Sequence, residues 1–196
     1  MSHYYTNDET LKHEYYQYDT IIDEMDFSFH TDAGVFSKSG LDFGTRVLLE
    51  TLDLQEQETT ILDMGCGYGP IGIYVGKKYP QKKITMVDVN LRALDLAKQN
   101  LVQNNTTATV IESNLFDGIV GLFDVIISNP PIRTGKQNLY TFYKTALTYL
   151  NLNGKLWLVV AKKQGAESTI DYLKTLYTKV NVLNKHKGYF IICAQK

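Results

Sequence analysis

Short hydrophobic runs and longer amphipathic stretches alternate along the chain from Thr59 onward. The short runs are rich in branched and aromatic residues and have the length of buried strands. The longer stretches repeat apolar residues every three or four positions, as helices with one buried face do. A further helix is predicted upstream, over Leu41–Leu54. The predicted strands are Thr60–Met64, Ile84–Asp88, Thr109–Glu112, Phe123–Ser128, Leu156–Ala161, Val180–Leu183 and Tyr189–Ala194, and the predicted helices between them are Ile71–Tyr79, Leu91–Gln103, Leu139–Leu150 and Ala166–Leu176.

The connections between these strands predict the topology of the sheet. Strands joined by helices of this length pair in parallel, and their helices cover both faces of the sheet. Only Asn184–Gly188 separates the last two strands, which is too short for a crossover, so these two must pair antiparallel. The sequence therefore predicts an α/β, Rossmann-like fold with a mostly parallel seven-stranded sheet, an antiparallel C-terminal strand and helices on both faces.

The first thirty residues do not follow this alternation. Residues 1–20 are polar and rich in tyrosine, which is typical of a loosely attached arm. Phe27–His30 and Val35–Phe36 flank Thr31–Gly34, which predicts a hairpin with a glycine-containing turn. We therefore expect an N-terminal extension over residues 1–30 and a single domain over residues 31–196.

Composition narrows the class of protein. The chain is 44% hydrophobic and 21% charged, as globular proteins are. It has no apolar run approaching the ~20 residues of a membrane helix, and its N-terminus lacks the pattern of a signal peptide. The two cysteines, Cys66 and Cys193, cannot build a disulfide framework, and the four histidines lack ligand spacing. We expect a cytoplasmic protein without a metal or a membrane partner.

Charge is distributed unevenly along the chain. The net charge is -1, but residues 133–196 hold eleven of the 20 Lys and Arg residues and only two of the 21 acidic ones. Such asymmetry favours a polyanionic partner that docks on one side of the molecule. Solvated surface lysines would give the same pattern, so charge alone leaves nucleic-acid binding open.

A glycine-rich loop follows the first strand of the alternating region. Gly65–Gly69 lies between that strand and the next helix, where glycine lets the backbone turn sharply and lets a ligand approach it. A dinucleotide fingerprint needs glycine at the sixth position of the loop, where this chain has Pro70. Asp88 ends the second strand, about 20 residues farther on, where an acid can bind both hydroxyls of a ribose. A helix N-cap is the other reading of Asp88.

The pattern Asp63-x-Gly65-x-Gly67-x-Gly69 resembles motif I of the class I methyltransferases that use S-adenosylmethionine (SAM). The resemblance implies that the carboxylate and the loop hold the methionine end of SAM, and that the product is S-adenosylhomocysteine. Asn114 stands where relatives often carry an acid that meets the adenine amine, and Cys66 is interpreted as a small packing residue. The expected cofactor-binding residues are Asp63, Gly65, Cys66, Gly67, Gly69, Asp88, Val89, Asn114 and Asn129.

The fourth strand of this series ends in Asn129-Pro130-Pro131-Ile132. Two prolines make the segment rigid and keep Asn129 out of helical conformation. Such a loop presents oxygen acceptors to the N–H groups of an amine, which frees the nitrogen lone pair to attack a methyl group. Catalysis would then consist of positioning and electrostatics, with these four residues as its centre. Asn-Pro also marks ordinary turns, which is the alternative without chemistry.

Asn129-Pro130-Pro131 is shared by methyltransferases that act on adenine, guanine or protein glutamine. With Ile132 and the following Arg133-x-Gly135-Lys136 it resembles the bacterial family of small-subunit ribosomal RNA guanine-N2 methyltransferases. The resemblance extends to Leu41-Asp42-x-Gly44-Thr45 upstream and to Lys162–Ala166 and Lys187–Tyr189 downstream. It implies transfer of methyl to the N2 amine of a guanine in 16S ribosomal RNA, with ribosomal RNA or the small ribosomal subunit as partner. We expect the protein to be a monomer.

A base in folded RNA must be unstacked before it enters such a pocket. We expect Phe36, Ile132 and Tyr189 to enclose the base. Arg133, Lys136, Lys162, Lys163 and Lys187 are expected to hold phosphates. The alternatives are an N-methyltransferase of adenine in RNA or of protein glutamine, an RNA-binding module with a vestigial site, and a nicotinamide-dependent oxidoreductase.

Overall fold

The computed structural model describes residues 12–130 and 135–196, which form a two-stranded hairpin and a seven-stranded sheet with five helices. A 3-10 turn, Lys162–Gln164, follows β7. The strands are β1 Tyr15–Ile22, β2 Met25–Asp32, β3 Thr60–Met64, β4 Lys83–Asp88, β5 Thr109–Glu112, β6 Phe123–Ser128, β7 Leu150–Ala161, β8 Lys179–His186 and β9 Tyr189–Gln195, and the helices are α1 Phe43–Thr51, α2 Pro70–Lys78, α3 Leu91–Gln103, α4 Lys136–Tyr149 and α5 Ala166–Lys174.

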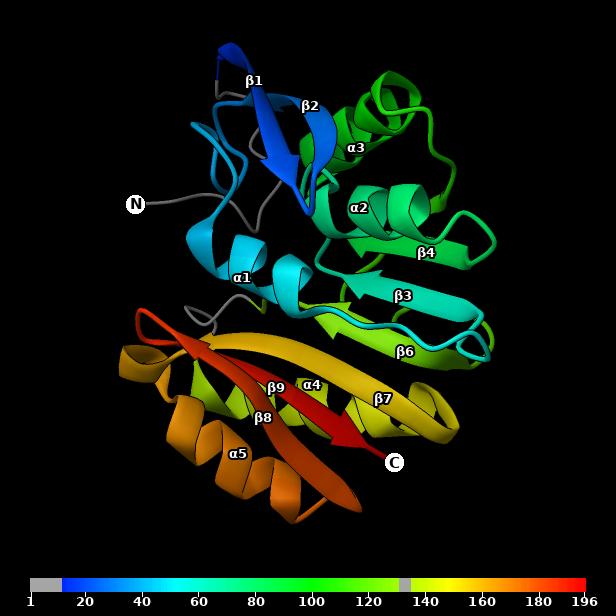
Figure 1. Cartoon of the computed structure of the whole chain (residues 1–196), viewed down its shortest axis with the longest axis vertical. Coiled ribbons are helices and arrows are strands. Elements are labelled where there is room, and N and C mark those ends of the chain that lie inside the picture. The colour runs from blue at the N-terminus through cyan, green and yellow to red at the C-terminus, as the bar shows by residue number, and fades with distance from the viewer. Residues whose placement is uncertain (1–11, 131–134) are drawn as a thin grey trace.

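The large sheet has the order β5-β4-β3-β6-β7-β9-β8 (Figure 1). Strands β3 to β7 pair in parallel, and β9 runs antiparallel to both of its neighbours, β7 and β8. The predicted fold is therefore confirmed, including the antiparallel pairing at the C-terminus. The chain builds the sheet outward from β3 in one direction and from β6 in the other. This reversal opens a crevice between β3 and β6 at their carboxyl ends.

Helices cover both faces of this sheet. Helices α1, α2 and α3 pack on one face together with the hairpin, and α4 and α5 pack on the other (Figure 1). Neighbouring residues of one strand enter different cores: Ile61 and Val125 belong to the first, and Leu62 and Ile126 to the second. Successive side chains of a strand point to opposite faces, so strands buried on both faces are hydrophobic at nearly every position.

The starts of three helices are fixed by residues close to the crevice. Asp42 caps α1, its carboxylate accepting a hydrogen bond from the Thr45 N–H at 2.8 Å. Asn90 caps α3 in the same way through Ala93. Helix α2 begins with Pro70, whose fixed φ suits the first helical position. Each start holds its loop against the ends of the parallel strands.

The N-terminal hairpin differs from the prediction. The structure places its turn at Asp23 and Glu24, between β1 and β2, and the expected turn at Thr31–Gly34 includes the last two residues of β2 instead. Both turn residues have positive φ, 47° and 63°, which side chains other than glycine adopt rarely, so composition gave no signal for this turn. The described end of the tyrosine-rich segment is therefore a strand rather than an arm.

Two asparagines, one in α3 and one at its C-terminal end, fasten the hairpin to the domain. Asn100 accepts from the His30 N–H at 2.7 Å and donates to the His30 carbonyl at 2.9 Å, and Asn104 does the same with Ser28. The two amides thus satisfy the backbone edge of β2 as a neighbouring strand would. The expected boundary at residue 30 falls inside β2. We propose that the domain includes the hairpin.

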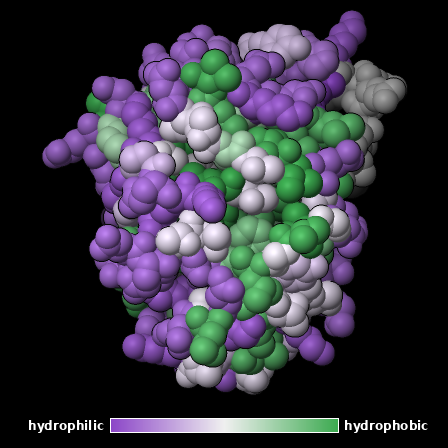
Figure 2. Space-filling view, turned by 90° about the vertical axis from the view of Figure 1, so that its right-hand side faces the viewer, coloured by the Kyte–Doolittle hydropathy of each residue, from purple (hydrophilic) through white to green (hydrophobic). Residues whose placement is uncertain are grey.

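Figure 2 shows the edge at which the parallel strands begin, opposite the crevice. Hydrophilic residues cover much of this face, and hydrophobic residues form a broken band between them. The exposed hydrophobic side chains of the described chain include Val120, Leu122 and Leu152. None of the helices in residues 12–130 and 135–196 is long and apolar enough to cross a membrane.

Candidate active site

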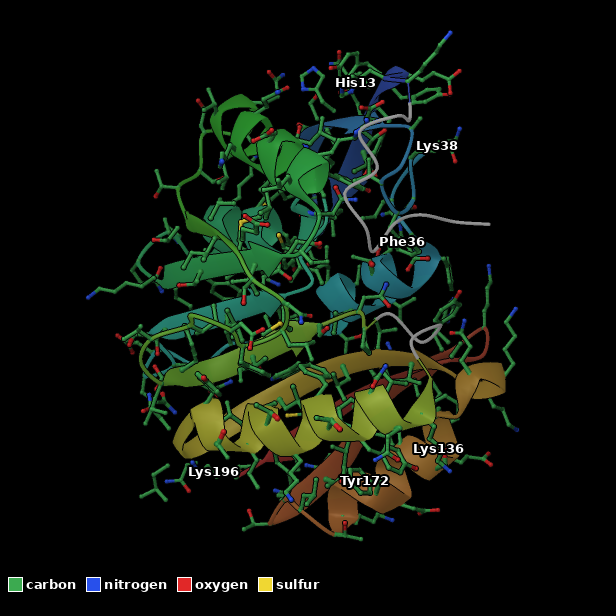
Figure 3. All side chains as sticks on the ribbon, turned by 180° about the vertical axis from the view of Figure 1, so that it is seen from behind. His13, Phe36, Lys38, Lys136, Tyr172 and Lys196 are labelled. Carbon is green, nitrogen blue, oxygen red and sulfur yellow. The ribbon has the colours of Figure 1, made fainter. Side chains whose placement is uncertain are left out.

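A cavity of about 750 Å³ opens at the carboxyl ends of β3, β4 and β6. Its walls come from the glycine loop, the ends of β4 and β5, the start of α1, the segment after β6 and the first turns of α4. Figure 3 shows Phe36 and Lys136 at this end of the molecule and Lys196 at the other. The volume lies within the range of small-molecule sites, about 300–1,000 Å³.

The glycine loop exposes its backbone to the cavity. Gly65 and Gly67 have φ angles of 72° and 56°, and a Cβ added to either would meet nothing within 4 Å. Both glycines line the cavity, and the N–H groups of Gly65 and Cys66 bind the Val87 carbonyl of β4, each at 2.9 Å. The loop is therefore held open as a cradle that a ligand can approach closely.

Asp88 lines the cavity and also supports the loop. Its Oδ2 accepts from the Gly67 N–H at 2.8 Å, and its Oδ1 accepts from the Asn90 N–H at 2.9 Å. Burial raises the pKa of this carboxyl. Because Asn90 is the residue that caps α3, Asp88 is free of the capping role. Each carboxylate oxygen can accept a further hydrogen bond, as binding to a ribose requires.

Asp63 and Gly69 lie beneath the loop and do not line the cavity. Asp63 is fully buried, and its Oδ2 accepts from the Gly72 N–H at 2.8 Å. Its Oδ1 has no hydrogen-bond partner in the described part of the chain, and burial raises its pKa to about 7. A Cβ on Gly69 would lie 2.8 Å from the Met86 side chain. Both residues shape the loop from below rather than forming its surface.

Ionisation of Asp63 should make the protein less stable as the pH rises. Between the unfolded pKa of about 4 and the folded pKa of about 7, the folded protein keeps a proton that the unfolded chain has lost. The free energy of unfolding therefore falls with increasing pH in this window and levels off above it. We expect the melting temperature of the ligand-free protein to show this decline, and Asp63→Asn to flatten it. An unchanged slope in the variant would contradict the assignment.

The remaining predicted cofactor residues surround the loop. Cys66, Val89 and Asn114 line the cavity. The Cys66 side chain is 4% exposed, and burial raises the pKa of its thiol well above the ordinary value. A thiol that stays protonated is a poor nucleophile, as expected of a packing residue. No group of three or more acidic, His or Cys side chains able to hold a metal ion is found in the described residues.

Asn129 follows β6, and its amide nitrogen is bound by two side chains at the start of α1. Its Nδ2 donates to Asp42 Oδ2 at 3.1 Å and to Thr45 Oγ1 at 2.9 Å. A carboxylate has no proton to give, so the nitrogen of the amide must face it. The amide oxygen is thereby left as an acceptor beside the cavity, which Asn129 and Pro130 both line. Pro131, Ile132 and Arg133 lie outside the described residues.

Two of the other predicted substrate residues, Phe36 and Tyr189, line the cavity, and the predicted lysines are not among its lining residues. Lys162 and Lys163 are exposed in the turn after β7, and the Lys162 N–H binds the Gly188 carbonyl of the β8–β9 turn at 2.7 Å. Lys187 of that turn lies 5.3 Å from the centre of the Phe43 ring, and Lys136 begins α4. The turn after β7 and the β8–β9 turn thus lie side by side, and both carry basic side chains.

Several lining residues had not been predicted. Asp42 and Thr45 of α1, Ser128 of β6 and Phe142 of α4 line the cavity. Asp42 belongs to the predicted helix Leu41–Leu54, but 87 positions separate it from Asn129. No local pattern indicates such a contact.

The geometry suits SAM. Gly65 and Gly67 offer an open cradle, and Asp88 offers paired acceptors at the end of β4. The buried carboxylate of Asp63 leaves one oxygen unpartnered near that cradle. Lining residues from both sides of the β3–β6 crevice leave room for a second reactant beside the cofactor.

Comparison with known sequences identifies relatives over the whole chain. The model of the methyltransferase small domain family matches residues 26–193. YbxB of Bacillus subtilis (strain 168), an uncharacterized protein, is 40% identical over 197 residues that cover 99% of this chain and 98% of that one. The ribosomal RNA small subunit methyltransferase C of Haemophilus influenzae (strain 86-028NP) is 38% identical over 184 residues, 92% of this chain and 51% of the relative. The chain thus spans about half the length of that relative.

Solved structures agree on the fold. The 16S rRNA N2 methyltransferase RsmC of T. thermophilus, in complex with AdoMet and guanosine, matches with a TM-score of 0.81 at 23% identity, over 93% of this chain and 50% of that one. A methyltransferase of Pyrococcus furiosus matches with a TM-score of 0.66 at 22% identity, over 84% and 90% of the two chains. Because the family model covers most of the sequence and the cofactor loop agrees with it, the chain belongs to the methyltransferase small domain family and is a class I, SAM-dependent methyltransferase related to the ribosomal RNA small subunit methyltransferase C proteins.

Proposed function

We propose that this enzyme transfers a methyl group from SAM to the N2 amine of a guanine in 16S ribosomal RNA. The observation that carries the proposal is the orientation of Asn129, whose nitrogen is bound by Asp42 and Thr45 so that its oxygen is an acceptor at the cavity. The named relatives that methylate small-subunit ribosomal RNA support the choice of substrate.

The glycine loop and Asp88 would hold the cofactor. Asp88 would accept hydrogen bonds from the ribose hydroxyls, and the backbone of Gly65 and Gly67 would contact the amino-acid end. Val89 and Asn114 would contact the adenine. When bound, SAM supplies an electrophilic methyl group. Because Asp88 also binds the Gly67 N–H, ribose binding and loop shape are coupled in one side chain.

Asn129 would act on the acceptor amine. The lone pair of an exocyclic amine is delocalised into the ring, which makes the nitrogen a poor nucleophile. A hydrogen bond from the amine to Asn129 Oδ1 localises that lone pair and fixes its direction, and the two partners of Asn129 prevent the amide from rotating. Pro130 adds rigidity to the backbone at this point. Such prearranged acceptors lower the barrier without reorganising during the reaction.

Aromatic and basic side chains would hold the RNA. A base that enters the cavity has left its stack, and the aromatic rings of Phe36 and Tyr189 offer it new contacts. Lys136, Lys162, Lys163 and Lys187 would bind phosphates and orient the strand. We propose that the protein acts as a monomer, in the cytoplasm, on ribosomal RNA or the small subunit.

Methyl transfer from labelled SAM tests the proposal. Wild-type protein is incubated with ribosomal RNA and with small subunits that lack the modification. The product nucleosides are separated and identified by mass spectrometry. Label in N2-methylguanosine is the expected result. Label in methyladenosine, or in protein glutamine with none in RNA, would overturn the substrate and leave the enzyme class intact.

A further inference from the structure

We propose that Asp42 reads the N1–H of the target guanine and thereby selects guanine over adenine. This inference rests on the proposed function and assigns a specificity-determining role to a residue at the start of α1. Asp42 lies at the cavity wall beside Asn129, although it comes from a segment on the other side of the glycine loop in sequence.

The carboxylate of Asp42 is held firmly by one of its oxygens. Oδ2 accepts from the Thr45 N–H at 2.8 Å, from Thr45 Oγ1 at 3.3 Å and from Asn129 Nδ2 at 3.1 Å. Oδ1 accepts no hydrogen bond from the described residues. Oδ2 therefore positions the side chain, and Oδ1 remains available as an acceptor in a residue that lines the cavity.

Two neighbouring side chains consequently present two acceptors. Asn129 Oδ1 is one, because the amide nitrogen is bound on the other side, and Asp42 Oδ1 is the second. Guanine carries two adjacent donors on one edge, the N1–H and the N2 amine. Adenine places its N6 amine beside a bare N1, which is an acceptor. The pair of acceptors matches guanine, whereas adenine would bring a lone pair against a carboxylate.

A site with two such acceptors rejects adenine strongly. A carboxylate that loses water and finds no donor keeps the full cost of its desolvation. Sites built to bind a donor therefore exclude analogues that lack it better than apolar pockets exclude a smaller group. The side-chain amide of glutamine has a carbonyl oxygen beside its amine, so it is disfavoured for the same reason.

An aromatic ring lies beside this acceptor pair. A Cβ on Gly44 would come within 2.7 Å of Tyr189 Cε1, so the first turn of α1 packs directly against that ring. The Phe43 ring lies 5.6 Å from the Tyr189 ring, centre to centre. Glycine at position 44 thus allows Tyr189 to approach Asp42, where its ring can contact the base whose edge the two acceptors bind.

Binding of two nucleosides to wild-type protein and to Asp42→Asn tests the proposal. The protein is saturated with S-adenosylhomocysteine, and the affinities of guanosine and 2-aminopurine riboside are measured by ligand-observed NMR. The second nucleoside keeps the amine but has a bare N1. Wild type should prefer guanosine by about tenfold or more, as expected for one base-edge contact. In Asp42→Asn an amide N–H can face N1, which suits the bare N1 of 2-aminopurine, so the preference for guanosine should be lost or reversed.

The variant keeps the local structure, because asparagine caps helices as well as aspartate does and its oxygen can still accept from Asn129. Asp95→Asn is the matched control: it makes the same change at an exposed residue of α3 outside the cavity and should leave the preference for guanosine as it is in wild type. Equal affinities of wild type for the two nucleosides, or an unchanged preference in Asp42→Asn, would overturn the inference. Because no RNA is used, failure to label ribosomal RNA would reject the proposed substrate without changing this result.

Discussion

Replacing Asn129 by alanine should reduce methyl transfer by at least about a hundredfold, which is the usual cost of removing one prearranged hydrogen-bonding group from an active site. The affinity for SAM should stay close to that of wild type. The reason is that the Asn129 oxygen faces the acceptor amine, while the cradle and Asp88 lie on β3 and β4. Single-turnover rates and calorimetric titration with SAM measure the two quantities separately.

Asn129→Asp distinguishes chemistry from simple packing. It has the same size and keeps an acceptor, but it removes the Nδ2 donor and places a second carboxylate against Asp42. We expect it to be nearly as inactive as the alanine variant, because repulsion moves the side chain away from its position. Wild-type turnover in Asn129→Ala would refute the role of this residue. A loss of SAM affinity as large as the loss in rate would place it in the cofactor site instead.

The fold could be predicted because its central strands are buried on both faces. Such strands are uniformly hydrophobic, so Phe123–Ser128 is found with its observed bounds. The helix Leu91–Gln103 is likewise bounded as predicted, since Asn90 caps its start. The hairpin could not be found this way. It is held by Asn100 and Asn104, whose side chains bind a strand 70 and 76 positions away, and such polar residues give no sign of this role in the sequence.

The candidate site was predictable where strands end. Residues just after a parallel strand share one edge of the sheet, so Gly65, Asp88 and Asn129 were expected together and line one cavity. Asp42 was not expected there, because it belongs to the helix before the first parallel strand. Its role follows from a contact between α1 and β6 that only the packed structure shows. The sequence thus predicts the site residues that follow the parallel strands, and it does not predict those that the packing of a helix places beside them.

Replacing Asp88 by alanine should lower SAM affinity by about a hundredfold or more. Hydrogen bonds to a charged group contribute about twice as much as neutral ones, and this carboxylate would lose two with the ribose. The change also removes the acceptor of the Gly67 N–H, which lies 2.8 Å from Asp88 Oδ2. The glycine loop therefore loses a hydrogen bond that supports it, in addition to the bonds that SAM loses. Calorimetric titration gives the affinity, and thermal unfolding of the ligand-free protein reports the support.

Asp88→Asn is the matched control for this prediction. Asparagine has the size of aspartate but only one acceptor oxygen, because its amide nitrogen is a donor. The variant should bind SAM more tightly than Asp88→Ala and more weakly than wild type, with a smaller loss of thermal stability. The two effects can then be told apart. Thermal stability reports the hydrogen bond to the Gly67 N–H, and SAM affinity reports the number of acceptors available to the ribose. Wild-type affinity in Asp88→Ala would contradict the ribose role. A loss of stability alone would make Asp88 only a support of the loop.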